Sequence, residues 1–495
     1  MSSISIKNKT PQSRGYRSVK LCVVVCLIAS IATACGFQRY QAKPIDPQQQ
    51  QSQYLARTPD GEGFKQFLIS QNYSETQLPI TQWGIKELTL CALFFHPDLN
   101  LSRAEWRAAM AEQSTASQRA ELGVSGGIGN HSKTDGDVSP WTLGVGIDIP
   151  IETAGKREAR IDRAIQLSEA ARLQIGQTAW QVRSRLTKSW LAFQYASLQT
   201  APLEKELAIR KSIVAMLEKR LAAGAASSVE VTNARLGLQK AQQQWSQNTG
   251  RIVELSAKLA SDAGLPLSTF SQLNIAKIEV STSAFTQSEP LFNNEQLQQT
   301  ALLNRLDIRA ALARYAASEA KLRIEIARQY PNIVLSPSYT FDQNDHVWSL
   351  GLSSLLTLIH KNRGLIEEAR ALREVEAAKF EVLQASVISQ LTQSKAMIAT
   401  ANAAFQQAQD YAQALQARSQ KSQRQFDAGQ IDRLELANTQ LENISATQNV
   451  LTSAYQLALA ITELEDAMQY PMDSARDITS SIEDQSLNRN TINPK

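Results

Sequence analysis

Residues 141–152 read WTLGVGIDIPIE. Tryptophan, leucine, valine and isoleucine occupy the odd positions, whereas the even positions are threonine, glycine, aspartate, proline and glutamate. Because successive side chains of a strand point to opposite sides, this alternation predicts a strand with one apolar face. A second alternating stretch, residues 122–130, precedes it, and a polar loop joins the two. We therefore expect a β-hairpin over residues 122–152.

Helical patterns flank this hairpin. A short helical stretch runs to about Glu121, and a very long one extends from about Lys156 to Ala223. At ~1.5 Å per residue, the long helix would span roughly 100 Å. Pro202 lies inside it and predicts a kink or a restart there. The next helix begins after a capping box over residues 227–230 and ends near residue 263.

The same pattern occurs a second time. Strands are expected at about 331–358, with a turn at 344–346, and then a long helix at 363–426 and a last helix to about 469. Equivalent residues are 205 to 207 positions apart: Trp141 with Trp348, Gly224 with Gly429, Ser227 with Asp432, and Glu230 with Glu435. The chain is therefore a tandem repeat of helix, β-hairpin and long helical hairpin, and mainly α in class.

The N-terminus reads as an export signal. The first 34 residues carry five basic side chains and no acid, and an apolar run from Leu21 to Ala34 is too short to span a bilayer comfortably. Without them the chain has 46 basic and 47 acidic residues, a net charge of −1, and it has no basic patch for nucleic acid. The expected parts are a signal peptide (1–34), a lipid-anchored tether with an N-terminal equatorial segment (35–79), the first repeat (80–264), a connector (265–292), the second repeat (293–470) and a disordered tail (471–495).

Residues 32–36, Ala-Thr-Ala-Cys-Gly, resemble a bacterial lipoprotein box. In such a box the cysteine, here Cys35, becomes the acylated first residue, although the usual leucine three positions earlier is Ala32 here. Ordinary signal-peptide cleavage near the same place is the alternative. Gly36 is not acidic, so the common signal for retention in the inner membrane is absent and an outer-membrane anchor is expected.

Several short sequences resemble the TolC family of outer-membrane efflux proteins over about residues 80–470. They are His96-Pro97-Asp98-Leu99, Arg305-Leu306-Asp307-Ile308, Ala327-Arg328-Gln329-Tyr330-Pro331, the two Trp-x-Leu-Gly strands, and the two Ala-Gly tips followed six residues later by an acid. Residues 150–157 and 361–364 look most like the branch that serves heavy-metal pumps. Two features depart from the family: no proline precedes the first strand, and Pro202 interrupts a helix that is usually continuous.

The resemblance implies a homotrimer with a small twelve-stranded barrel in the outer membrane and a cylinder of twelve helices beneath it. Four strands per chain agree with this, since about eight strands are the lower limit for a closed barrel. Its periplasmic tips would meet an adaptor protein tied to an inner-membrane pump. The pump would supply the energy, so no cofactor is expected. A small soluble sheet packed on the helices is the alternative, but it leaves helices near 100 Å unexplained.

The resemblance also implies where the functional residues lie. Adaptor docking is expected at Gly224, Ser227, Gly429 and Asp432, and a gate ring at Glu230, Glu435 and Asn438. Both glycines follow a helix where the chain reverses, which favours a left-handed backbone. Symmetry would turn each acid into a ring of carboxylates that favours cations. Helix capping alone is the alternative role for the acids, and Asn438 stands where some relatives carry a second acid.

Enzymatic and metal-binding functions find little support. The four histidines have no partner ligand at helical spacing, and no HExxH, phosphate-binding or GxSxG motif occurs. Cys91 is the one cysteine outside the signal and the lipoprotein box, so no disulfide or cysteine metal site is expected. We therefore expect an efflux duct without catalytic residues. A duct for protein secretion, or a periplasmic coiled-coil lipoprotein without a pore, remain the alternatives.

Overall fold

The computed structural model describes residues 38–71, 73–134, 136–277, 299, 301–354 and 361–471. The chain divides into two compact units, Met1–Tyr54 and Leu55–Lys495. The described part of the first unit contains most of helix α2 (Pro47–Leu55), none of whose residues is buried. Cys35, the expected signal peptide (1–34) and residues 472–495 of the expected tail lie outside the described residues.

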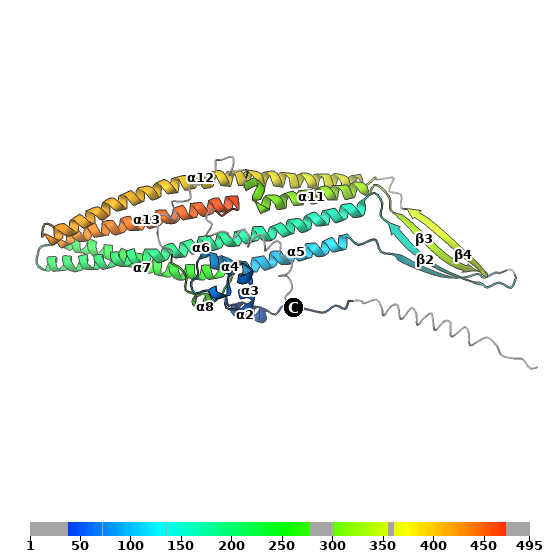
Figure 1. Cartoon of the computed structure of the whole chain (residues 1–495), viewed down its shortest axis with the longest axis horizontal. Helices are drawn as coiled ribbons and strands as arrows, with labels where there is room; N and C mark the ends of the chain where they lie inside the picture. The colour runs from blue at the N-terminus through cyan, green and yellow to red at the C-terminus, as the bar shows by residue number, and fades with distance from the viewer. Residues whose placement is uncertain are drawn as a thin grey trace, which may run out of the picture. The chain divides into compact units, whose positions relative to one another are not determined.

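The second unit holds the duplicated arrangement. Its elements in the first half are α3 (Glu62–Ser70), the 3₁₀ helix η1 (Glu75–Gln77), α4 (Ile85–Phe95), α5 (Pro97–Ala116), β1 (Gly123–Asn130), β2 (Trp141–Ile151), α6 (Lys156–Ala222), α7 (Ser228–Asp262) and α8 (Leu267–Phe270). Those in the second half are α11 (Leu306–Ala327), β3 (Ile333–Asp342), β4 (Asp345–Ser354), α12 (Arg363–Asp427) and α13 (Arg433–Met468). The strands extend from one end of α6 and α12, and both helical hairpins turn at the opposite end (Figure 1). The tandem repeat expected from the sequence is confirmed.

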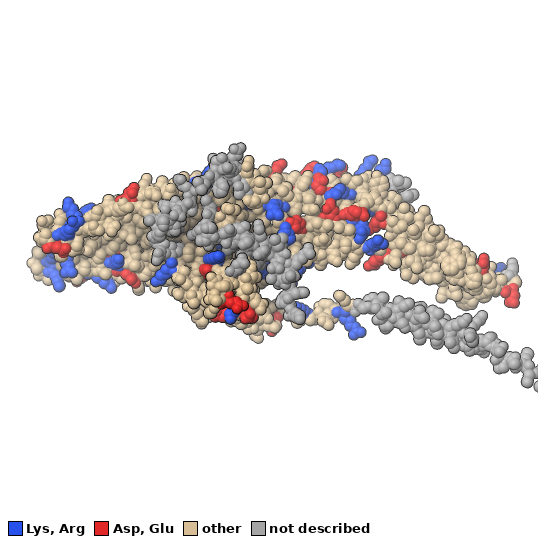
Figure 2. All heavy atoms as spheres, viewed as in Figure 1, with Lys and Arg blue, Asp and Glu red and all other residues tan. Residues whose placement is uncertain are grey.

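The four strands form one antiparallel sheet in the order β1-β2-β3-β4. Across it, Pro150 is opposite Val334 and Val334 is opposite Ser353, so these three side chains share one face. The apolar face carries Trp348 and Leu350, which are 80% and 71% exposed in one chain. In the view of Figure 2 the strands bear few charged side chains except at their far end.

The turn between β3 and β4 differs from the expected position. Gln343 and Asn344 both have positive φ angles, +48° and +72°, which suits a two-residue hairpin turn. Asp345 and His346 already belong to β4. The sequence placed the turn at residues 344–346 because asparagine and aspartate both favour turns. The last four residues of the expected second strand, 355–358, lie outside the described part of the chain.

Two helical expectations are corrected. Helix α6 does not restart at Pro202, which is buried within a continuous helix. The missing amide costs one hydrogen bond, but packing on both sides of the proline keeps the two parts aligned. Helix α5 ends at Ala116 rather than near Glu121, because Arg160 donates hydrogen bonds to the carbonyl oxygens of Ala116 and Gln118 and so holds the chain where it leaves the helix.

Helix α6 lies at the centre of the unit and packs against α5, α7, α11 and α13. The largest core cluster surrounds its middle, where Phe64 of α3 and Leu186 of α6 are almost fully buried. The outer helices keep apolar side chains exposed. On α12 these include Leu365, Leu372, Val375 and Val382, which are 46–71% exposed. No described helix has an apolar stretch long enough to cross a membrane.

Candidate gate at the helical tips

Both helical hairpins end in the same backbone motif. Gly224 adopts a φ of +72°, its amide donates to the carbonyl of Leu221 at 3.0 Å, and the amide of Ala225 donates to the carbonyl of Arg220 at 2.7 Å. The second tip repeats both hydrogen bonds around Gly429, which also has a φ of +72°. This paired arrangement satisfies the last carbonyl groups of a helix and requires a left-handed residue. Both glycines therefore lie at the helix ends, as the sequence predicted, and the left-handed backbone there accounts for their presence.

The helices that leave the two tips are capped differently. The Ser227 hydroxyl accepts from the Glu230 amide at 3.2 Å, and the Glu230 carboxylate accepts from the Ser227 amide at 2.7 Å, which completes a capping box. Asp432 accepts from the Glu435 amide at 2.8 Å. The Glu435 side chain does not return the bond to the Asp432 amide, so the second cap is only half of a capping box. Its carboxylate has no hydrogen bond or ion pair among the described residues.

These contacts keep the first acid ionised. The hydrogen bond from the Ser227 amide, together with that from its hydroxyl, lowers the pKa of Glu230. The same bonds hold the Glu230 carboxylate against the start of α7. Both glutamates are exposed, and Glu435 is the one whose carboxylate makes no hydrogen bond or ion pair within the described residues.

A cross-link joins the two hairpins. Arg220, at the end of α6, lies 2.9 Å from the carboxylate of Asp432, at the start of α13, and lowers the pKa of that carboxyl. The sequence analysis missed Arg220. The duplication held a signal, because the equivalent residues 205 positions away are Gln425 for Arg220 and Ser227 for Asp432. At each of these two positions one repeat has a charged residue, Arg220 or Asp432, and the other repeat has an uncharged one.

A small apolar cluster supports the cross-link. Ile213 and Leu217 of α6 pack with Val231 of α7 and Ala437 of α13. The hairpin of the first repeat thus packs directly on the second. On α13, Glu435 and Asn438 are exposed while Ala437 is buried, and a spacing of three residues puts the two polar side chains on one side of the helix. The gate residues expected from the sequence therefore face away from the packed core of this chain.

The described histidines form no metal site. Among the described residues no group of three or more histidine, cysteine, aspartate or glutamate side chains could hold a metal ion. His131 bonds to Thr142 and to Asp342, and His346 bonds to Tyr339. His360 lies outside the described residues.

The sequence profile of the outer membrane efflux protein family matches residues 93–265 and 297–468, which together make up more than half of the chain. The chain belongs to the outer membrane efflux protein family. The two matched stretches fall in the two halves of the duplicated fold. Each of them contains one β-hairpin and one helical tip.

Solved structures of outer-membrane channels share the fold. The outer-membrane channel OprN superposes with a TM-score of 0.65 at 19% identity, covering 78% of this chain and 90% of that chain. The outer membrane protein VceC of Vibrio cholerae superposes with a TM-score of 0.63 at 17% identity, covering 79% of this chain and 97% of that chain. At these identities the likeness establishes the α/β-barrel fold alone.

A curated relative is the cobalt-zinc-cadmium resistance protein CzcC of Cupriavidus metallidurans. It is 24% identical over 241 residues, which are 48% of this chain and 54% of that protein. The match therefore spans about half the length of the relative.

Proposed function

We propose that this chain is one of three identical subunits of an outer-membrane efflux duct. An inner-membrane pump, reached through a periplasmic adaptor, would drive small molecules or metal ions through it. The observation that carries the proposal is the four-stranded sheet, which has β1 and β4 as unpaired edges and one apolar face. Unpaired edges cannot stand in a bilayer, where backbone groups have no water to bond, so other chains must complete the barrel.

The helices support the same assembly. Leu365 and Leu372 on α12 are seven residues apart, as are Val375 and Val382, and all four are exposed in one chain. Apolar positions that repeat in sevens form the seam by which one helix packs on another. On α7, Val253 is 65% exposed. We infer that the outer helices α7 and α12 meet the neighbouring subunits.

The tips support a gate at the periplasmic mouth. Three copies of Glu435 would place three free carboxylates around the opening, and the Arg220–Asp432 pair would hold the two hairpins of each subunit together. A ring of carboxylates at a narrow mouth favours cations. The 24% identity to a protein named for cobalt, zinc and cadmium resistance supports metal ions as one class of cargo.

The same proposal includes a lipid on Cys35 as an outer-membrane anchor. Mass spectrometry of the mature N-terminus tests it. We expect a diacylglyceryl and an acyl group on Cys35, and an unmodified N-terminus downstream of this cysteine would refute the anchor.

Conductance in a planar lipid bilayer tests the duct. Purified protein should insert with unitary, stepwise currents, because a shared barrel provides a continuous water path. Detergent-purified protein that folds and associates with liposomes but conducts no ions in any tip variant would contradict the duct and favour a coiled-coil lipoprotein without a pore.

A further inference from the structure

A cavity of about 920 Å³ lies where the sheet meets the helices, and five of its lining residues are cationic. They are Lys156, Arg160 and Arg163 of α6, and Lys321 and Arg328 at the end of α11 and just after it. Positions 156, 160 and 163 share one face of α6, because residues three and four apart are neighbours on a helix. The cavity is thus lined by one face of each helix.

The sheet residues in the cavity identify the side on which it lies. Four strand residues line it. Pro150, Val334 and Ser353 are direct cross-strand neighbours on the polar face of the sheet, and the fourth, Ser354, is the last residue of β4. The opposite face carries the exposed tryptophan and leucine side chains. In a membrane barrel the apolar face contacts lipid and the polar face lines the interior. The cavity therefore opens toward the lumen of the proposed duct.

The positive charges are only partly neutralised. Arg160 forms a bidentate pair with Glu152, at 2.5 and 3.0 Å. Glu325, which is buried, receives Lys321 at 2.6 Å and Arg328 at 2.8 Å. The hydrogen bond from Arg160 is the main cause that lowers the pKa of Glu152. Burial raises the pKa of Glu325, but the hydrogen bonds from Lys321 and Asn362, together with the nearby charge of Arg328, outweigh it and leave that pKa lowered. Two carboxylates thus face five cations.

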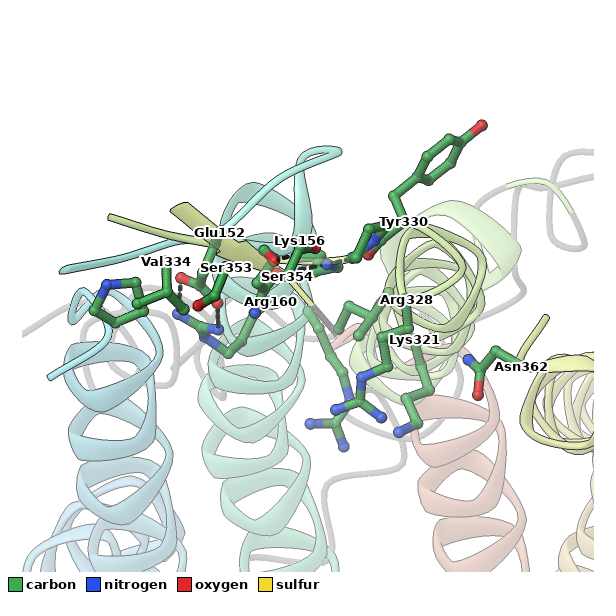
Figure 3. Close-up of a pocket in the computed structure, with 15 residues that line it drawn as sticks. Glu152, Lys156, Arg160, Lys321, Arg328, Tyr330, Val334, Ser353, Ser354 and Asn362 are labelled. Atoms are coloured by element: carbon green, nitrogen blue, oxygen red, sulfur yellow. Dashed lines mark hydrogen bonds and ion pairs between the residues drawn. The ribbon is translucent and has the colours of Figure 1, made fainter. Parts of the chain in front are cut away.

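Several donors remain available. Arg163 has as its nearest acid Glu112, 3.8 Å away at an exposed position, so a net charge of two positive units remains even when Glu112 is counted. Arg328 uses a single guanidinium nitrogen for Glu325, and its other nitrogens have no hydrogen bond within the described ranges. Figure 3 shows Lys321 and Arg328 extending from α11 into the space beside α6, while Tyr330 points away.

The opposite faces of the same two helices carry no surplus of positive charge, since Glu158 and Asp162 line the pocket there together with Arg323. There Arg323 of α11 pairs with Asp162 of α6 at 2.6 Å, beside a second, separate pocket that Tyr330 also lines. The surplus of positive charge is therefore confined to the lumenal face. In addition, α6 and α12 both begin beside the cavity without a side-chain cap, so the partial positive charge of their N-termini adds to that of the side chains.

We propose that this lumenal cavity binds small multivalent oxyanions, such as phosphate, diphosphate or the anionic groups of a cargo molecule. Arg163, Lys321 and Arg328 would supply the contacts, since guanidinium and ammonium groups recognise such oxygens with charged hydrogen bonds. The lumenal position rests on the duct proposed above. In the trimer at least six net positive charges would then encircle the lumen near the membrane, opposite in sign to the carboxylates at the tips.

Calorimetric titration with inorganic pyrophosphate tests the site in the full-length protein in detergent. We expect saturable binding that weakens when the salt is raised from 50 to 500 mM, because salt screens the attraction. The double variant Arg163→Gln/Arg328→Gln removes the cation whose acid is 3.8 Å away and the guanidinium that binds Glu325 through one nitrogen only. It should weaken binding tenfold or more, or about 1.4 kcal/mol. Arg323→Gln removes the same charge from the opposite face and should leave binding unchanged.

Each other outcome overturns the site. No saturable binding to the wild-type protein, or equal losses in the double variant and in Arg323→Gln, would refute it. Retention of phosphatidylglycerol that depends on Arg163 and Arg328, without pyrophosphate binding, would place a lipid headgroup there and refute the lumenal ligand. Bilayer conductance of the same preparations separates the two proposals: protein that conducts but does not bind pyrophosphate keeps the duct and loses the oxyanion site.

Discussion

The contact between Arg220 and Asp432 makes a specific prediction about the gate. It joins the first hairpin to the second at the tip, and Asp432 also caps α13 through the Glu435 amide. Asp432→Asn keeps the cap, because asparagine and aspartate are equally good at this position. The variant therefore removes the ion pair alone. Arg220→Gln removes it from the other side.

The magnitude follows from the exposure of the pair. The two side chains are 39% and 51% exposed, so solvent screens their attraction and each pair contributes about 0.2–1 kcal/mol. Three pairs in a trimer would add to about 0.6–3 kcal/mol in favour of joined tips. At 1.4 kcal/mol per factor of ten, either variant should raise the ratio of open to closed tips roughly 3- to 150-fold.

Single-channel recording in a planar bilayer measures that ratio. The double variant Arg220→Gln/Asp432→Asn should open no more than either single variant, since both remove the same contact. The difference from wild type should shrink at 1 M salt, where the screening length is about 3 Å. Strictly additive effects of the two substitutions, or wild-type recordings for both, would refute the role of this pair in holding the tips.

Three further predictions concern the same tips. Gly429→Val should impair export while the protein still reaches the outer membrane, since a β-branched residue at a φ of +72° costs about 1–2 kcal/mol. Gly250 also has open space around it but lies within a helix, so cells with Gly250→Val should show normal export in the same efflux assay. Glu435→Gln should lower the cation preference measured as a reversal potential, whereas Glu230→Gln should change it less because that carboxylate is bound in its cap, and equal shifts would count against the distinction. The pKa of Asp432 is lowered, so its ion pair with Arg220 is present at neutral pH and is lost only as pH falls through that lowered value. Channel opening should therefore stay constant down to about pH 4 and rise below it. A rise near pH 6 would point to another group.

Local patterns in the sequence predicted most of the fold. The strands follow from alternation over about ten residues, and the tips follow from a glycine with a cap residue three positions later, as at Gly224 and Ser227. Such signals are contained within a few neighbouring residues. The duplication strengthened them, because each pattern occurred twice.

Contacts between distant residues could not be predicted in this way. Arg220 and Asp432 are 212 positions apart, and Lys321 and Arg163 line one cavity although they belong to different repeats. Nothing near Pro202 in the sequence indicates that packing keeps α6 continuous through it. The different freedom of Glu230 and Glu435 was also hidden, since both follow a tip glycine by six residues and only the side-chain contacts distinguish them.

The unpaired edges of the sheet lead to the most direct test, which is the mass of the native assembly released from detergent micelles. If three chains share one barrel, native mass spectrometry should detect a single species of three subunits. It should also detect smaller species for Val382→Lys. Val382 is 71% exposed, so the substitution places a charge on the seam of α12 without disturbing the core of one chain. A folded wild-type monomer that stays in solution without detergent would contradict the shared barrel and, with it, the duct.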